Sequence, residues 1–388
     1  MGLPNVKILL QNGALGGLAR FADGVAGLIG TGVAVAGIGI GDPKLIFSLE
    51  DAIELGITET SNPKAFRQIK EFYVEGGQGA ELYIMLVPDT MTISSMVDNT
   101  NLNGAKKLLD YAQGRIRLLG VFFAPPVGYV LDTTAGIDAD AFAALVNAQV
   151  LGNAYAAVQA PVRIVIEGRG FTGVVANLTD LHTMDYNRAG IIVAGSLNDG
   201  SASVGMFLGR KARVPVQRKA SRVKSGSLVL LEAFVGSSSV KTFSGLGAMH
   251  DKGYIVMRTF PGVTGIYFNA DHTATKTTDD YSTFARGRVI DKAQVIAYAT
   301  YVEELDDEVL IQEDGTLDPG VVAFLESKIE YQINEIMKSN REISSVKAFI
   351  NPAQNVLATN KTKVVLKIIP VGYNSEIEVE LGFNNPNV

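Results

Sequence analysis

The last residues of the chain alternate strictly between apolar and charged positions, in the stretch "EIEVELGF" at residues 376–383. The apolar positions are Ile377, Val379, Leu381 and Phe383, and glutamates occupy the places between them. A period of two puts the apolar side chains on one face of a β-strand. Because chain ends usually fray, this strand needs a partner, which is either the preceding strand of the same chain or a sheet of another molecule.

Apolar runs and amphipathic segments alternate through the first half of the chain. We expect strands at residues 82–87, 116–125, 162–168 and 188–196, and helices at residues 48–56, 62–74, 103–114 and 138–158. Ser48 and Asn62 stand where helix N-caps are expected, and Pro63 takes a first helical position. Elements that alternate at these lengths predict an α/β domain, with a mixed or parallel sheet covered by helices.

One uncharged stretch, residues 24–41, is long enough to raise the question of a membrane helix. It holds seven glycines among its eighteen residues, and each glycine inside a helix costs about 1 kcal/mol relative to alanine. Many of the other positions are β-branched. We therefore interpret the stretch as a buried strand with turns, and we expect no membrane insertion.

The periodic pattern weakens between residues 201 and 247, where the stretch 209–227 is locally basic within an acidic chain. We expect a solvated loop with a strand there. The alternative interpretation is a contact with an acidic neighbouring subunit.

The last third of the chain predicts a smaller α+β domain. We expect two strands around Pro261-Gly262, helices at residues 281–305 and 318–339, and strands at residues 343–352 and 364–369. Residues 5–11 form a further short expected strand, followed by a glycine-rich stretch. The expected organisation is an N-terminal arm and linker at 1–20, an α/β domain at 21–245, an α+β domain at 246–372 and a C-terminal strand at 373–388.

Composition narrows the possible functions. The chain has 388 residues, 47% of them apolar and 19% charged, which is a globular balance. Its net charge of −6 gives no general attraction to nucleic acid. It has no cysteine, so disulfides, thiolate chemistry and cysteine-ligated metal sites are excluded. The first residues lack the pattern of a secretion signal, so we expect none.

A search for catalytic motifs gives no candidate. The three histidines, His182, His250 and His272, lie far apart in sequence, and we expect each to be a surface or core residue. There is no nucleophile elbow and no phosphate-binding loop. The acidic run at 303–308 lacks the ligand spacing of a calcium loop. We therefore expect no enzyme, no cofactor and no metal site, although an α/β enzyme with carboxylates that we did not locate remains an alternative.

Three stretches together resemble one protein family. The first runs from "AGLIGTGVAVAGIGIGDPKLIFSLEDAIELG" to "ELYIMLV" at residues 26–87, and the second is "KGYIVMRTFPGVTGIYFNADHTATKTTDDYSTFARGRVIDKA" at 252–293. The third is "VVLKIIPVGYNSEIEVELGF" at 364–383. In this order they resemble the contractile tail sheath proteins of phages and related contractile injection systems. In that family a helix with the residues found here as Arg288, Val289, Asp291 and Lys292 follows a strand such as 265–268. The resemblance covers roughly half of the chain and leaves residues 90–245 unmatched.

The resemblance implies a two-domain structural subunit that polymerises helically around an inner tube and contracts. Its terminal arms would complete sheets in neighbouring subunits. The residues implied for strand exchange are Val6, Ile8 and Leu10, together with Ile377, Val379, Leu381 and Phe383. The implied hinges are Gly13, Gly16, Gly17 and Gly372. From charge, we expect the tube to contact the acidic residues Glu303, Glu304, Asp306 and Asp307.

The implied partners are other copies of the chain, the inner tail tube protein, and baseplate and terminator proteins, with no nucleic acid. The resemblance further implies assembly in the bacterial cytoplasm and a place in a virion tail or an extracellular injection particle. The remaining alternative within such particles is another tail or baseplate assembly protein.

Overall fold

The computed structural model describes residues 23–383. Contacts divide the chain into two compact units, one ending at Glu303 and one beginning at Glu304, which we call the large unit and the small unit. This division falls later in the chain than the boundary that we expected at 245/246. The physical reason is that residues after 246 pack into the large unit, where the Phe284 ring meets the Phe207 ring at 5.2 Å between centroids.

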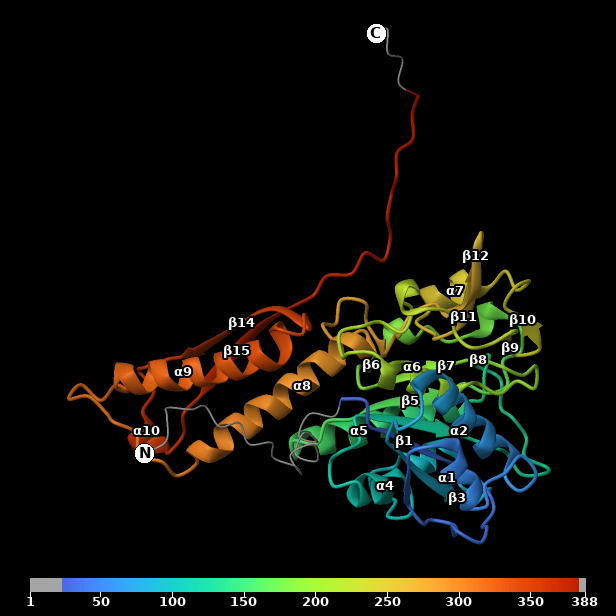
Figure 1. Cartoon of the computed structure of the whole chain (residues 1–388), viewed down its shortest axis with the longest axis horizontal. Helices are drawn as coiled ribbons and strands as arrows, with labels where there is room; N and C mark the ends of the chain where they lie inside the picture. Colours follow the sequence, from blue (N-terminus) through green and yellow to red (C-terminus); the bar gives the residue numbers. More distant parts are fainter. Residues whose placement is uncertain (1–22, 384–388) are drawn as a thin grey trace, which may run out of the picture. The chain divides into compact units, whose positions relative to one another are not determined.

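A six-stranded sheet forms the centre of the large unit (Figure 1). In spatial order its strands are β2 (Lys44–Ile46), β3 (Leu82–Val87), β1 (Ala26–Thr31), β4 (Leu118–Phe122), β5 (Arg163–Glu167) and β7 (Ala189–Ile192). All neighbours are parallel except β2, which runs antiparallel to β3. Every residue of β1, β3, β4, β5 and β7 is buried, as is usual where helices cover both faces of a sheet.

The large unit also contains helices, several of which cover the sheet. They are α1 (Leu49–Glu54), α2 (Pro63–Gly76), α3 (Ile93–Met96), α4 (Ala105–Tyr111), α5 (Asp140–Ala157), α6 (Val204–Arg213), α7 (Leu246–Asp251) and α8 (Phe284–Tyr301). The Ser48 hydroxyl caps α1 by accepting a hydrogen bond from the Asp51 backbone N–H at 3.0 Å. The expected helices at 48–56, 62–74 and 138–158 are confirmed. Asn62 occupies the N-cap position of α2 as expected, but its side chain bonds to the backbone of Val33 and does not cap the helix.

Helix α6 corrects the expectation of a loop with a strand between residues 201 and 247. It packs against α2 through glycines rather than through large apolar side chains. A Cβ at Gly205 would lie 1.9 Å from the Gln68 carbonyl oxygen, and one at Gly209 would lie 2.4 Å from the Phe72 carbonyl oxygen. Its basic residues Arg210 and Lys211 are buried. The helix also buries Val204, Met206, Phe207 and Leu208, but Gly205 interrupts this apolar run and basic residues follow it, so the sequence shows no clear helical pattern.

Short strands complete the large unit. They are β6 (Asp185–Tyr186) with β13 (Ala274–Thr275), β8 (Ala194–Gly195) with β9 (Phe234–Val235) and β10 (Ser238–Ser239), and β11 (Met257–Phe260) with β12 (Val263–Phe268). The two strands expected around Pro261-Gly262 are therefore confirmed. The uncharged stretch 24–41 contains β1, as expected. Among the described residues, no helix is long and apolar enough to cross a membrane.

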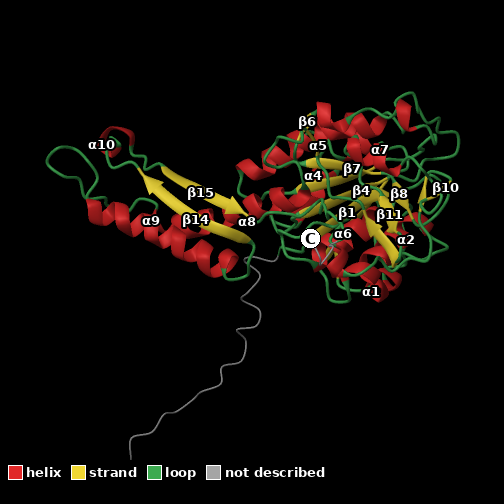
Figure 2. Ribbon diagram, turned by 90° about the horizontal axis from the view of Figure 1, so that it is seen from above, coloured by secondary structure: helices red, strands yellow, loops and turns green. Residues whose placement is uncertain are grey.

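The small unit is a two-stranded sheet with one long helix beside it (Figure 2). Its elements are α9 (Pro319–Ile333), a π-helical turn (Asn334–Lys338), β14 (Ile343–Ile350), α10 (Val356–Thr359) and β15 (Val364–Pro370). Asp318 caps α9, and its carboxylate accepts the Gly320 N–H at 2.7 Å. The mixed α/β architecture with several sheets agrees with expectation. The strand expected at residues 5–11 lies outside the described residues.

Candidate functional site

The sheet of the small unit has one covered and one open face. On β14, Val346 and Ile350 are buried on the side of α9, whose buried residues include Ile329 and Ile333. On the opposite face, Phe349 keeps 56% of its surface exposed, and Ile369 keeps 59%. A two-stranded sheet is marginal alone, so this unit depends on α9 for its core.

The C-terminal segment follows β15 without regular structure. Residues 371–383 form no helix and no strand in the described chain, and in Figure 1 they run on from β15 without folding back. The exposed fractions of Ile377, Val379, Leu381 and Phe383 are 75%, 69%, 92% and 110%. The hairpin of this segment with β15, which was one of the two sequence interpretations, is thus not formed here. The four apolar side chains are exposed, and no described residue buries them.

The other expected site residues divide into two groups. Val6, Ile8, Leu10, Gly13, Gly16 and Gly17 lie outside the described residues. Gly372 is described, and a Cβ there would meet nothing within 4 Å. Glu303, Asp306 and Asp307 are exposed, whereas Glu304 forms an ion pair with Lys328 of α9. Glu304 is therefore already partnered within the small unit.

The charged motif on α8 has a structural role in the large unit. Arg288 donates to the backbone carbonyl oxygens of Lys211 at 2.8 Å and Asp23 at 2.9 Å. The Lys292 ammonium lies 2.7 Å from the Asp23 carboxylate. These contacts clamp the start of the described chain onto α8. The sequence singled out the motif but gave no sign of Asp23 as its partner.

Asp291, on the same helix, forms ion pairs with two arginines, one in β5 and one just before β7. Its carboxylate accepts from Arg163 Nε at 2.6 Å and from Arg163 Nη2 at 2.9 Å, and Arg188 Nη1 lies at 3.3 Å. The side chain of Arg163 is only 1% exposed. A second buried pair joins Lys211 to Asp271 at 2.7 Å, and burial lowers the pKa of Lys211 to about 8. Sequence reasoning missed both pairs, because their partners are 128 and 60 residues apart.

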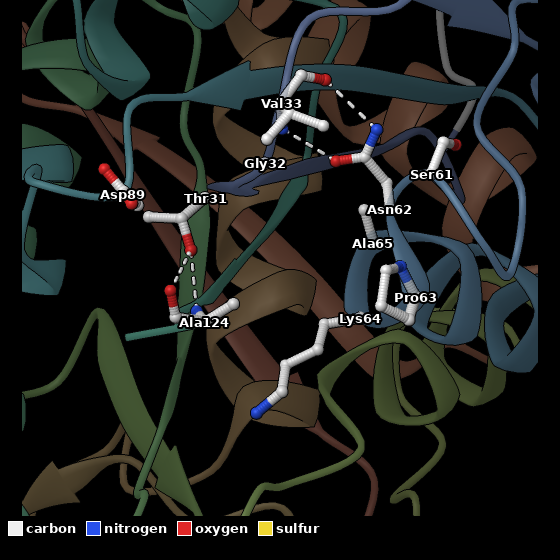
Figure 3. A pocket seen from close by; sticks show the side chains of 10 residues that line it. All are labelled: Thr31, Gly32, Val33, Ser61, Asn62, Pro63, Lys64, Ala65, Asp89 and Ala124. Carbon is white, nitrogen blue, oxygen red and sulfur yellow. Dashed lines mark hydrogen bonds between the residues drawn. The ribbon is translucent and has the colours of Figure 1, made fainter. Parts of the chain in front are cut away.

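A hollow at the carboxyl ends of β1 and β4 is where an α/β sheet usually binds ligands (Figure 3). Its polar side chains are occupied with backbone contacts. Thr31 bonds both to the N–H and to the carbonyl of Ala124, and the Asn62 amide bonds both to the N–H and to the carbonyl of Val33. Its volume of about 180 Å³ is below the range of about 300–1,000 Å³ for ligand pockets.

The charged residues of this hollow do not form a reactive pair. Lys64 lies 3.7 Å from Asp199, and burial is the main cause that lowers the pKa of Lys64. In the described part of the chain we find no nucleophile–base pair at the hollow. The hydrogen bonds at this hollow join the segment after β1 to Ala124, which follows β4, and to Asn62, which precedes α2.

The three histidines meet in space, although they are far apart in sequence. The His250 and His272 rings lie 4.7 Å apart between centroids, with 3.2 Å between Nδ1 of His250 and Nε2 of His272. The His182 ring contacts His272 at 5.3 Å. Among the described residues, no group of three or more histidine, aspartate or glutamate side chains could hold a metal ion. The three rings pack against one another within the large unit.

Family and structure comparisons cover nearly the whole chain. The model of the DUF2586 N-terminal domain matches residues 3–272, and that of the DUF2586 C-terminal domain matches residues 280–388. A comparison with curated proteins gives no match.

Solved structures share the fold over the full length. The helical sheath of the anti-feeding prophage in its contracted state is 12% identical, with 99% of each chain covered and a TM-score of 0.64. A chain of the anti-feeding prophage baseplate is also 12% identical, with 99% and 100% covered and a TM-score of 0.63. The contracted PVC sheath of an extracellular contractile injection system is 12% identical, with 100% and 99% covered and a TM-score of 0.60. The chain has the fold of contractile sheath proteins.

Proposed function

The chain belongs to the DUF2586 family, and from that premise and its sheath fold we propose that it is the subunit of a contractile tail sheath. In this proposal it polymerises helically around an inner tube and contracts to drive the tube through a target envelope. The single observation that carries the proposal is the exposed apolar stripe at the C-terminal end of a chain with this fold. Four large apolar side chains in a row, left open in the monomer, indicate a partner surface.

Strand exchange is the proposed use of the stripe. Strand addition to a neighbour's sheet gains backbone hydrogen bonds worth about 1 kcal/mol each. Each large apolar side chain that becomes fully buried adds about 1.5–3 kcal/mol. Strand exchange at every subunit would link each copy to its neighbours in the polymer. Gly372 would act as a hinge while the folded units move as rigid bodies. The N-terminal arm, with Val6, Ile8 and Leu10, is proposed to take part in the same joints.

The remaining parts of the proposal concern placement. Residues 246–372 would line the inner radius and residues 21–245 the outer surface. The segment from Glu303 to Asp314, which is acidic and contains no lysine or arginine, would face the tube. Its exposed residues Asp306 and Asp307 would make the contact. Baseplate and terminator proteins would cap the polymer, which would assemble in the cytoplasm before it joins a tail or an injection particle.

The test is co-expression of the full chain with its tube protein, followed by negative-stain microscopy and sedimentation. We expect tubes or ring stacks of one diameter. Val379→Asp, which places a charge in the stripe, should abolish them, whereas Glu378→Gln on the polar face should leave them intact. Monomers at all concentrations and salts, with and without the tube protein, would contradict the proposal.

A baseplate component is the second candidate, because one of the chains with this fold belongs to a baseplate. A baseplate component would give single rings of fixed stoichiometry that do not elongate when more protein is added. The same micrographs therefore separate the two functions.

A further inference from the structure

A polar pocket lies in the large unit between α5, α8 and the residues that begin β5 and precede β7. Its volume of about 460 Å³ falls within the range of about 300–1,000 Å³ for ligand pockets. Ile290 is the one aliphatic residue in its lining, and the other lining residues carry charged, amide or hydroxyl groups. A pocket of this composition suits a ligand that is itself polar.

Two arginines share one carboxylate in this pocket. Asp291 accepts from two nitrogens of Arg163, at 2.6 and 2.9 Å, and Nη1 of Arg188 lies 3.3 Å from the same carboxylate. Asp279 accepts from the amide of Asn187, and no ion pair joins it to either arginine in the described chain. Burial, followed by the charge of Arg163, lowers the pKa of Arg188. The lining therefore carries one more positive than negative charge.

Close packing on glycines holds both guanidinium groups. A Cβ at Gly152 of α5 would lie 2.8 Å from Cδ of Arg188. One at Gly287 of α8 would lie 2.4 Å from Cζ of Arg163. Nε of Arg188 donates to Oδ1 of Asn153 at 2.9 Å, whereas its Nη2 has no partner among residues 23–383 and is not buried. Arg188 is thus fixed in place with one side of its guanidinium free.

Three further polar groups of the lining are unpaired. Because Nε of arginine can only donate, the oxygen of Asn153 must face Arg188, and this leaves the Asn153 amide nitrogen as a donor. Nε2 of Gln294 donates to the carbonyl oxygen of Ala156 at 2.6 Å, which leaves its Oε1 as an acceptor. The Tyr281 hydroxyl forms no hydrogen bond with any residue that the structure describes, and it is not buried. Free donors beside a free acceptor match hydroxyl groups, which both donate and accept.

We propose that this pocket binds a small hydroxylated anion, of the class of sugar phosphates and sugar acids. The free side of Arg188 binds the phosphate or carboxylate oxygens, since a guanidinium fits both. Tyr281, Asn153 and Gln294 bind the hydroxyl groups. The inference goes beyond the proposed function, because every lining residue belongs to the large unit and none to the C-terminal segment.

Isothermal titration calorimetry of the full chain at constant ionic strength tests the pocket with four probes. Glucose 6-phosphate and glucuronate carry both the negative charge and the hydroxyl groups, glucose lacks the charge, and inorganic phosphate lacks the carbon-bound hydroxyls. We expect at least one of the two sugar anions to bind tenfold more tightly than glucose and than inorganic phosphate. The tighter of the two identifies the acid group. Equal affinities for all four probes, or no binding of either sugar anion, would overturn the inference.

Substitutions place the binding in this pocket. Arg188→Gln removes the charge-assisted hydrogen bond and should weaken the sugar anion at least tenfold. Tyr281→Phe keeps the ring but removes the hydroxyl, and it should weaken the same ligand several-fold. The control is Arg218→Gln, which removes an equal charge at an exposed position of the large unit outside the pocket. It should bind like the parent.

The remaining outcomes are decisive as well. If Arg188→Gln binds like the parent, or if Arg218→Gln weakens the ligand equally, the anion binds elsewhere and the inference is refuted. If Arg188→Gln does not fold, Tyr281→Phe decides, and unchanged affinity in that variant overturns the proposed contact. Val379→Asp should bind the sugar anion like the parent, so this inference and the proposed strand exchange can fail separately.

Discussion

Removal of the carboxylate of Asp291 should destabilise the large unit more than any change at an exposed ion pair. Asp291→Asn keeps the side-chain size but leaves the guanidinium of Arg163, which is 1% exposed, without a counter-charge. Stranding one partner of a buried pair typically costs about 3–5 kcal/mol. The carbonyl oxygens of Asn187 and Gly287 still accept from Arg163, at 2.7 and 3.1 Å. We therefore expect the lower end of that range, about 3 kcal/mol.

Differential scanning calorimetry of the full chain measures this change. At about 2 °C per kcal/mol for a unit of this size, the unfolding transition of the large unit should fall by about 6 °C. The matched control is Asp185→Asn, which removes an exposed partner of Lys276 at 3.0 Å, where the side chains are 76% and 59% exposed. That variant should lie within about 0.5 kcal/mol of the parent. Equal melting temperatures for the two variants would refute the stabilising role of the buried pair of Asp291 with Arg163.

Three further predictions concern the same unit. Burial is the main cause that lowers the pKa of His272, to about 3 from the ordinary 6.5, so the unfolded chain takes up a proton first on acidification. The contribution of His272 to stability should be constant above pH 6.5 and fall from pH 6.5 towards pH 3, and His272→Gln should make the fall of melting temperature over this range shallower. Gly205→Ala should destabilise by about 1–3 kcal/mol or more, because its Cβ would lie 1.9 Å from the Gln68 carbonyl oxygen, and urea unfolding that matches the parent would contradict the close packing of α2 and α6. Ser48→Ala should remove the cap of α1 at a cost of about 1 kcal/mol, seen as faster amide exchange confined to residues 49–54.

Sequence patterns predicted the elements in which apolar residues form an unbroken run or a regular alternation. The buried strand β3 is a continuous apolar run, and the segment from Ile377 to Phe383 alternates strictly. The pattern failed where burial uses other chemistry. In α6, glycine contacts and the buried charges of Arg210 and Lys211 accompany the buried apolar residues Val204, Met206, Phe207 and Leu208, and they obscure the helical pattern.

Of the candidate site, the sequence predicted only the alternating C-terminal segment. The alternating segment 376–383 is visible by itself, because its period does not depend on any other element. The hydrogen bonding at the outer edge of β14 depends on where α9 lies, since only that placement brings Glu326 and Glu330 against the N–H groups of Ile350 and Ala348. The meeting of the three histidines likewise follows from tertiary packing that no local pattern records.

The hydrogen bonds from β14 to α9 limit the number of strands that the small sheet can accept. A sheet open on both sides could accept two strands, and copies joined in that way could branch into networks. The carboxylates of Glu330 and Glu326 accept from the N–H groups of Ala348 and Ile350 on one side of the sheet. A single open edge then remains, and a strand that pairs there cannot lead to a branch.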